Sequence, residues 1–353
     1  MKNLIYLFLA VIIISCGGSD LATDGHPEDD YKNTKNPRGY NRPQPNDGSQ
    51  TNNQGDNTED NTGDNMLSGV NCQPPNLKKN VALNRKICKT DDCLIQFAGY
   101  WWWTNYQYSD TVHWFWNNGS SWNPRGAWVD GEGLHLTVKK DDLGGGTAWF
   151  SSEVVAVFEN DKKTLAKTGY GTYLVSARIK SDASFDKLDK NVAFGLFTFD
   201  KSGTYNSNNQ YREIDLAEIS RWGVPPASNV LDPRLAVGNA QFAIQLWNSN
   251  QNNVKRYSIN PVKEITLVMK WTGEGKPVSF YQYDGIFTLD NLPGSAANSW
   301  TTSSDQNKFI PNDGCQLFHM NLWMGNYGEG EAHPGPSNGQ TSEVVVTNFQ
   351  YRK

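Results

Sequence analysis

Ten residues, YREIDLAEIS from Tyr211 to Ser220, place three carboxylates within six positions of a segment that otherwise has the pattern of a β-strand. Because side chains alternate faces along a strand, Glu213 and Asp215 share one face, and strict alternation would put Glu218 on the other. A one-residue bulge near Leu216–Ala217 would return Glu218 to the same face. Three like charges on one face cost stability, which a protein tolerates best where the charges have a function. The segment therefore predicts a strand that carries an acidic site.

The first fifteen residues have the pattern of an export signal. Lys2 precedes an apolar run over 4–14 that is too short to span a bilayer permanently. Cys16 follows directly, and its setting resembles the lipobox of bacterial lipoproteins, in which the cysteine is lipidated. A secretory signal with an incidental cysteine is the alternative. We therefore expect a lipid-anchored protein of the cell envelope. A further hypothesis is that the anchor lies in the outer membrane and that the protein is exposed at the cell surface.

Residues 16–70 are expected to form a disordered tether. They are rich in Asn, Asp, Gly, Pro, Ser and Thr, and the stretch 17–69 has no Trp, Phe, Val or Ile. Such a segment cannot bury enough apolar surface to offset its ordering entropy. The remaining residues, 71–353, are predicted to form one domain.

Charge is distributed unevenly between these segments. The chain has 32 basic and 37 acidic residues; the signal holds one basic residue, and the tether four basic and ten acidic, which leaves 27 of each sign from residue 70 onward. A formally neutral domain argues against nucleic acid, because nucleic-acid binding depends on clustered Lys and Arg. A local basic patch for a sulfated substrate is less strongly excluded.

The pattern of the domain predicts an all-β fold. Gly, Asn, Asp and Pro separate short β-rich segments, and no long stretch has a helical period. All 13 Trp residues lie between 101 and 323. This arrangement is typical of a sandwich or a barrel. The predicted strands are 134–138, 172–178, 192–199, 212–219, 240–247, 265–271, 278–283, 317–324 and 344–351.

Two of the predicted strands, 240–247 and 317–324, alternate an apolar face with a face of amides, an imidazole and indoles. Sugar rings have apolar CH faces and many hydroxyls, so aromatic side chains beside amides suit them. Core packing is the alternative for any single tryptophan. The candidate sugar contacts on these strands are Gln241, Gln245, Trp247, His319, Asn321 and Trp323.

Four cysteines remain in the domain once Cys16 is set aside: Cys72, Cys88, Cys93 and Cys315. An even number in an exported protein favours disulfides, with three pairings open. We favour Cys88 with Cys93 and Cys72 with Cys315, and free buried thiols are the alternative. Five scattered histidines do not make a zinc site. We expect no metal at the site and no required cofactor, although the sequence allows a structural calcium ion.

The motif EIDLAE at 213–218 resembles the bulged E-x-D-x-x-E motif of glycoside hydrolase family 16, which includes laminarinases, lichenases, agarases, porphyranases and carrageenases. The resemblance covers roughly residues 97–353. It implies a concanavalin A-like jelly-roll sandwich with a concave substrate cleft. Three departures leave the reaction class intact and the substrate open: Arg212 stands where many laminarinases carry a small residue, and neither SRWG at 220–223 nor NAQ at 239–241 matches a substrate pattern. Segments in the family's order are 169–173, 177–180, 194–197, 271, 281–285 and 344–351.

The resemblance implies a retaining mechanism, with Glu213 as nucleophile, Glu218 as general acid/base and Asp215 orienting Glu213. Nearby negative charge is expected to raise the pKa of Glu218. Trp222 joins the candidate substrate contacts. A charged surface strand or a calcium site is the alternative interpretation of the motif.

The predicted function is cleavage of a β-linked polysaccharide within the chain, with a β-1,3- or mixed-linkage glucan favoured and an algal galactan as second choice. We expect a monomer whose partners are the polysaccharide and, through the lipid, the membrane. The alternative function is a non-catalytic carbohydrate-binding surface lipoprotein on the same fold.

Overall fold

The protein is represented by a computed structural model that describes residues 72, 88, 92–105, 122–141, 148–200, 209, 211–220, 238–245, 253–324 and 335–353. The predicted signal, the predicted tether and Cys16 lie outside these residues. Within the described part of the chain, no helix is long and apolar enough to cross a membrane.

The described residues form two antiparallel β-sheets and a few short 3-10 helices. One sheet, here called the acid sheet, contains the strand with the three carboxylates. Its order is β1 (Leu94–Phe97), β2 (Tyr100–Thr104), β6 (Ser152–Glu159), β15 (Leu317–Met324), β8 (Val192–Phe199), β9 (Ile214–Ile219), β10 (Ala240–Ile244) and β11 (Val254–Tyr257).

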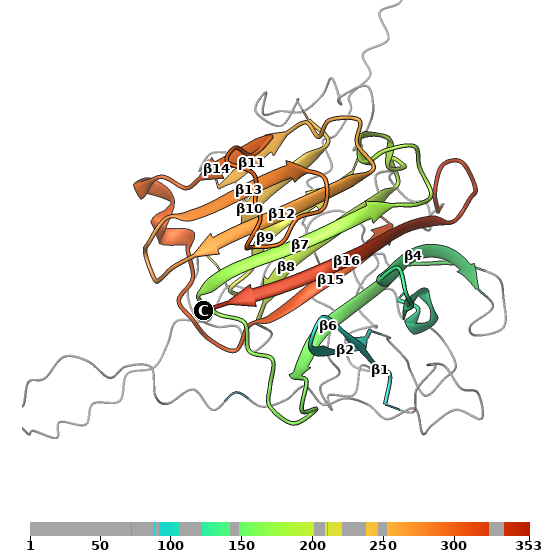
Figure 1. Cartoon of the computed structure of the whole chain (residues 1–353), viewed down its shortest axis with the longest axis horizontal. Helices are drawn as coiled ribbons and strands as arrows, with labels where there is room; N and C mark the ends of the chain where they lie inside the picture. The colour runs from blue at the N-terminus through green and yellow to red at the C-terminus, as the bar shows by residue number, and fades with distance from the viewer. Residues whose placement is uncertain are drawn as a thin grey trace, which may run out of the picture. The chain divides into compact units, whose positions relative to one another are not determined.

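The second sheet, here called the outer sheet, is the nearer one in Figure 1, where β13, β12, β7 and β16 lie side by side. Strand β5 (Ala148–Phe150) pairs with β4 beside this path. The order is β14 (Asn298–Thr301), β13 (Val278–Asp284), β12 (Glu264–Trp271), β7 (Gly171–Ile179), β16 (Ser342–Arg352), β4 (Leu134–Asp141) and β3 (Ala127–Val129). The 3-10 helices are η1 (Pro124–Gly126), η2 (Phe185–Lys187) and η5 (Ser304–Phe309).

The core lies between the two sheets and is rich in aromatic rings. Phe242 of β10 stacks on Phe280 of β13 with 5.2 Å between ring centroids, and Tyr173 of β7 stacks on Phe318 of β15 at 5.5 Å. Each pair joins one sheet to the other, so the fold is an all-β jelly-roll sandwich, as predicted. All eight residues of β8 are buried, and β8 lies in the middle of the acid sheet between β15 and β9.

The predicted strands agree with the structure to within a few residues where the structure describes them, and one of the differences is informative. The segment 212–219 was expected to be extended throughout, but β9 begins only at Ile214. Arg212 has φ +50°, in the left-handed region that interrupts a strand. Strands β1, β2, β3, β5, β6, β11 and β14 were not predicted, since most are short.

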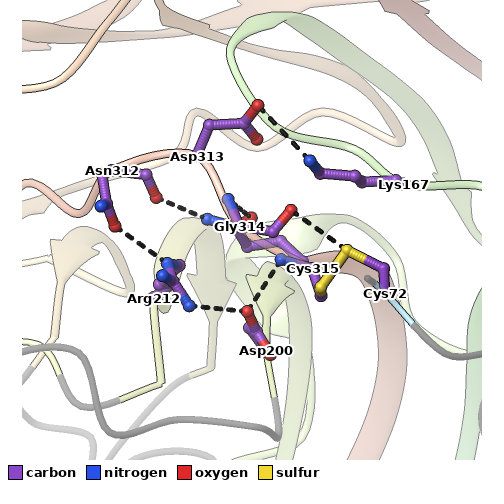
Figure 2. Close-up of a disulfide and its surroundings, with 9 residues drawn as sticks. Cys72, Lys167, Asp200, Arg212, Asn312, Asp313, Gly314 and Cys315 are labelled. Carbon is purple, nitrogen blue, oxygen red and sulfur yellow. Dashed lines mark hydrogen bonds and ion pairs between the residues drawn. A yellow bond between two sulfur atoms is a disulfide. The ribbon is translucent and has the colours of Figure 1, made fainter. Parts of the chain in front are cut away.

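The described residues contain two disulfides. One joins Cys72 to Cys315, which lies two residues before β15, and the other joins Cys88 to Cys93, which directly precedes β1. The first links positions 243 residues apart (Figure 2), so it closes nearly the whole domain into one loop. Such a long covalent loop restricts the unfolded chain and thereby favours the folded state.

Candidate active site

The bulge in β9 occurs where the sequence predicts it. Along β8, Leu196 pairs with Ala217 and the next residue, Phe197, pairs with Asp215, so Leu216 is the extra residue. The neighbour on the other side, β10, shows the same shift. Leu216 and Ala217 both join the core, as do Ile214 and Ile219. The shift therefore leaves the three acids on the face of the acid sheet that points away from the core.

The three acids are buried, with exposed fractions of 4% for Glu213, 0% for Asp215 and 1% for Glu218. Burying three carboxyl groups costs free energy, and two side-chain amides offset part of that cost: Gln241 on β10 and Gln245 directly after it. Gln241 Nε2 donates to Glu218 Oε2 at 2.5 Å, and Gln245 Nε2 donates to Asp215 Oδ2 at 2.7 Å. Gln241 and Gln245, predicted as sugar contacts, thus bond directly to the carboxyls and fix their orientation.

The central acid, Asp215, has a strongly perturbed pKa. Burial raises the pKa of the Asp215 carboxyl well above its usual range, and the negative charge of Glu218 raises it further. Hydrogen bonds with Gln245 and with the Glu213 carboxyl act in the opposite direction. Asp215 therefore interacts with both flanking carboxyls, with Glu218 through charge and with Glu213 through a hydrogen bond.

Strand register places five residues in one row across the acid sheet. Glu153 of β6 pairs with Asn321 of β15, which pairs with Gly195 of β8; Gly195 pairs with Glu218, which pairs with Gln241. Since neighbouring strands lie about 4.8 Å apart, this row extends over roughly 19 Å. We call it the polar row. It runs through Glu218 in the direction perpendicular to the strands.

Glu153 is a buried acid of the polar row that the sequence analysis missed. Its carboxylate accepts hydrogen bonds from Asn105 Nδ2 at 2.8 Å and Asn321 Nδ2 at 3.2 Å. His319 Nδ1 lies 3.5 Å from Glu153 Oε1, and its ring stacks on Phe197. The available signal was Glu153 near the start of SEVVAVFE, directly before a run of apolar residues that predicts a buried strand.

Several buried polar atoms on this face have no hydrogen-bond partner among the described residues. They include Asn321 Oδ1 and Asn105 Oδ1. Buried polar atoms in folded proteins are nearly always paired, so a group of exceptions needs a cause. A ligand that carries several hydroxyl groups would supply the missing donors.

The structure brings some predicted substrate contacts together and leaves others undescribed. His319 and Asn321 are buried on the face of the three acids, and Trp323, half-buried, follows them on β15. Trp222 and Trp247 lie outside the described residues, so their roles stay predictions.

One group of potential metal ligands occurs elsewhere in the described residues. Ligand atoms of Asp130, Glu132 and His135 lie within 4.8 Å of one another. His135 is already held between Asp130 Oδ1 at 2.8 Å and Glu343 Oε1 at 2.7 Å, and Glu132 bonds Lys180. The group is therefore a compensated charge network, and it supplies no argument for a metal ion.

Comparison with known proteins finds no matching family model and no matching curated protein. Among solved structures, the chain is similar to a Bacillus licheniformis β-glucanase, with 16% identity, a TM-score of 0.43 and coverage of 72% of this chain and 92% of that one. It is also similar to a prokaryotic β-1,3-1,4-glucanase (lichenase) derived from a mouse hindgut metagenome, at 14% identity, TM-score 0.43 and 76% and 96% coverage. A third similar structure is a pseudo β-1,3-glucanase of Mycobacterium tuberculosis, with 15% identity, a TM-score of 0.42 and coverage of 71% of this chain and 91% of that one.

Proposed function

We propose that the protein is a retaining glycoside hydrolase that cleaves a β-linked polysaccharide within the chain. The observation that carries the proposal is the bulge in β9, which places Glu213, Asp215 and Glu218 together on one face, buried and flanked by amide donors. A protein that only binds sugars has no need of three buried acids, whose mutual repulsion and desolvation destabilise the fold.

In the proposed mechanism, the Glu213 carboxylate attacks the anomeric carbon while Glu218 gives its proton to the departing glycosidic oxygen. This step forms a covalent glycosyl-enzyme. Glu218, now a carboxylate, takes a proton from water, and the water oxygen displaces Glu213 with restored configuration. Asp215, buried and hydrogen-bonded with the Glu213 carboxyl, orients Glu213 for both steps. That the pKa of Glu218 is raised stays a prediction.

The polar row supports a polymeric substrate. Glu153 and Asn321 on one side of Glu218, and Gln241 on the other, provide polar groups over a distance longer than one sugar ring. We favour a β-1,3- or mixed-linkage glucan, with a red-algal galactan as the second choice. The formal neutrality of the domain is consistent with an uncharged glucan.

A polysaccharide panel tests the proposal. The purified domain 71–353 should release oligosaccharides from at least one β-glucan or algal galactan, and their sizes distinguish cleavage within the chain from cleavage at its ends. NMR of the first-formed product should show a retained β-anomer. An inverted anomer would overturn the assignment of Glu213 as nucleophile.

Two nearly isosteric variants separate the enzyme from the alternative, a carbohydrate-binding protein. Glu213→Gln and Glu218→Gln should each lose most turnover but keep the fold and glycan binding. On a substrate with a good leaving group, formation of the glycosyl-enzyme needs little acid assistance, so Glu218→Gln should still form it. Azide should then restore turnover with retained configuration. Glu264→Gln, on the outer sheet, is the matched control and should keep full activity. Binding without turnover in the wild type would favour the alternative.

We also propose that Cys16 carries a lipid that anchors the protein to the cell envelope, with 16–70 as the spacer. A surface location would give the domain access to polymers too large to enter the cell. This proposal depends only on the sequence of residues 1–70 and is independent of the catalytic one.

A further inference from the structure

The residue that precedes the proposed nucleophile has an unusual backbone. Arg212 has φ +50°, although arginine has a Cβ that disfavours this conformation. Its side chain is buried, with 2% of it exposed. A non-glycine residue persists in such a conformation only where its surroundings fix it, and such positions are common at functional sites.

The surroundings of Arg212 form a buried clamp (Figure 2). Arg212 Nη1 donates to Asp200 Oδ2 at 2.8 Å, and Arg212 Nε donates to Asn312 Oδ1 at 3.0 Å. Asp200 is as buried as Arg212. The guanidinium lies against Gly314, where an added Cβ would stand 2.5 Å from Arg212 Cζ, so only glycine leaves room for it.

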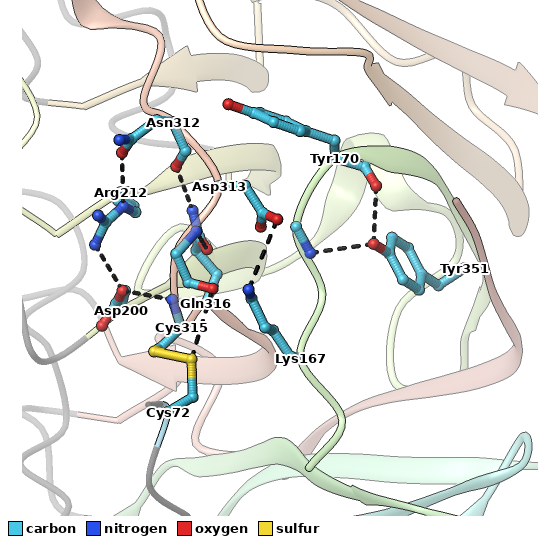
Figure 3. Close-up of polar contacts among 12 residues, drawn as sticks. Cys72, Lys167, Tyr170, Asp200, Arg212, Asn312, Asp313, Cys315, Gln316 and Tyr351 are labelled. Atoms are coloured by element: carbon cyan, nitrogen blue, oxygen red, sulfur yellow. Dashed lines mark hydrogen bonds and ion pairs between the residues drawn. A yellow bond between two sulfur atoms is a disulfide. The ribbon is translucent and has the colours of Figure 1, made fainter. Parts of the chain in front are cut away.

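The segment Asn312–Gln316, here called the clamp loop, is itself held firmly (Figure 3). The Cys315 backbone N–H donates to Asp200 Oδ2 at 2.9 Å, and the Gly314 N–H donates to Gln316 Oε1 at 2.7 Å. Gln316 Nε2 donates to the Asn312 carbonyl at 3.0 Å. The disulfide from Cys315 to Cys72 ties this loop to the beginning of the domain.

The backbone of Glu213 is held by side chains before β9 begins. The Glu213 N–H donates to Asn209 Oδ1 at 2.9 Å, and Asn209 Nδ2 donates to the Glu213 carbonyl at 3.0 Å. On the preceding residue, Thr198 Oγ1 donates to the Arg212 carbonyl at 3.2 Å. The orientation of the Glu213 peptide therefore depends on where the Arg212 peptide lies.

We infer that Arg212 is a positioning residue for Glu213, and that the disulfide-tied clamp loop is its anchor. The inference deepens the proposed function and rests on it. Arg212 is too deeply buried to contact a substrate, so it acts through the backbone that it fixes. A buried ion pair is weak evidence for added stability, because desolvation offsets its attraction. Catalytic groups, in contrast, must be held to within roughly 0.5 Å of their productive geometry, which gives a reason to keep the clamp.

The test removes one contact of the clamp without removing a charge. Asn312→Ala deletes the acceptor for Arg212 Nε, whereas Asn312→Asp keeps an acceptor oxygen at the same place. Asn312 is partly exposed, so the alanine variant is expected to fold. Val346→Ala, in β16 of the outer sheet, is the control that destabilises the domain away from the clamp. The double variant Cys72→Ser with Cys315→Ser releases the loop and keeps the other disulfide.

Activity of the full chain on the polysaccharide that it cleaves best is measured together with the melting temperature. Asn312→Ala and the double cysteine variant should lower kcat by about tenfold or more with little change in KM, since a small misplacement of a reacting group has effects of this size. They should also shift the acidic limb of the pH–kcat profile, because the Glu213 carboxyl moves relative to Asp215. Asn312→Asp should have a kcat close to that of the wild type. Val346→Ala should also keep the wild-type kcat, although its melting temperature falls as far as that of Asn312→Ala.

Two results are distinguishable. If the wild type cleaves the substrate and Asn312→Ala loses melting temperature but keeps kcat and its pH profile, the clamp is only structural and the inference is wrong. If the wild type and Val346→Ala both bind the glycans but cleave none, the proposed function itself fails.

Discussion

Gly195 lies between Asn321 and Glu218 in the polar row, and replacing it with alanine tests the geometry of that row. A Cβ at this position would stand 2.4 Å from Asn321 Oδ1. An ordinary contact needs a separation of about 3.5 Å, so the oxygen must move by roughly 1 Å. Asn321 is not free to do so, because its Nδ2 donates to the buried Glu153.

The size of the effect follows from these contacts. Losing the hydrogen bond to a buried carboxylate costs about 1–3 kcal/mol, and an off-rotamer asparagine costs about 1 kcal/mol more. The reduced freedom of the unfolded chain offsets about 0.4–1 kcal/mol. The net loss of about 1–3 kcal/mol in the free energy of unfolding should lower the melting temperature by roughly 2–5 °C in a domain of this size.

Activity should respond more strongly than stability. The new methyl group stands beside Glu218 on the face proposed to bind the polysaccharide, so KM should rise about tenfold while the fold is kept. Thermal unfolding and steady-state kinetics of the variant provide the measurement. Gly294→Ala is the matched control, because a Cβ there meets nothing within 4 Å.

A double-mutant cycle decides whether the clash with Asn321 is the cause. In an Asn321→Ala background, Gly195→Ala should cost little, because the displaced oxygen is gone. If the glycine substitution costs as much in that background as in the wild type, the reasoning from Asn321 is refuted. Wild-type stability and KM in Gly195→Ala alone would refute it as well.

Three further predictions concern the acid, the anchor and the cysteines. Because the pKa of Asp215 is raised in the fold, the contribution of Asp215 to stability is complete below about pH 4 and is lost as pH rises through the raised pKa. Asp215→Asn should therefore flatten the decline in melting temperature as pH rises from about 4 through that pKa. An unchanged slope would contradict the assignment of the decline to Asp215. The full chain should partition into detergent and Cys16→Ser should release it, whereas equal solubility of both would exclude the lipid. Thiol titration of the denatured, unreduced domain should find no free thiol, and four reactive thiols would contradict both disulfides.

Some features of the site followed from the sequence alone. Alternation along 211–220 requires a bulge if three acids are to share a face, and the register of β9 against β8 contains it at Leu216. The strands β8 and β15 were predicted with the bounds that the structure shows, because their apolar alternation and the turn residues around them are local signals. The all-β class followed from the same periodicity.

Other features depend on which strands become neighbours, and local periodicity carries no information about that. Glu153 is 65 residues from Glu218 in sequence, yet β15 and β8 place both in one row. Arg212 appeared in the sequence only as a departure from a family pattern. Its partners Asp200 and Asn312 lie 12 and 100 residues away in sequence, and the fold brings both to the buried guanidinium. The sequence determined the acids, their face and the class of fold, whereas only the tertiary structure decided what surrounds the acids, because long-range strand pairing and the low dielectric of the interior exist only in the folded chain.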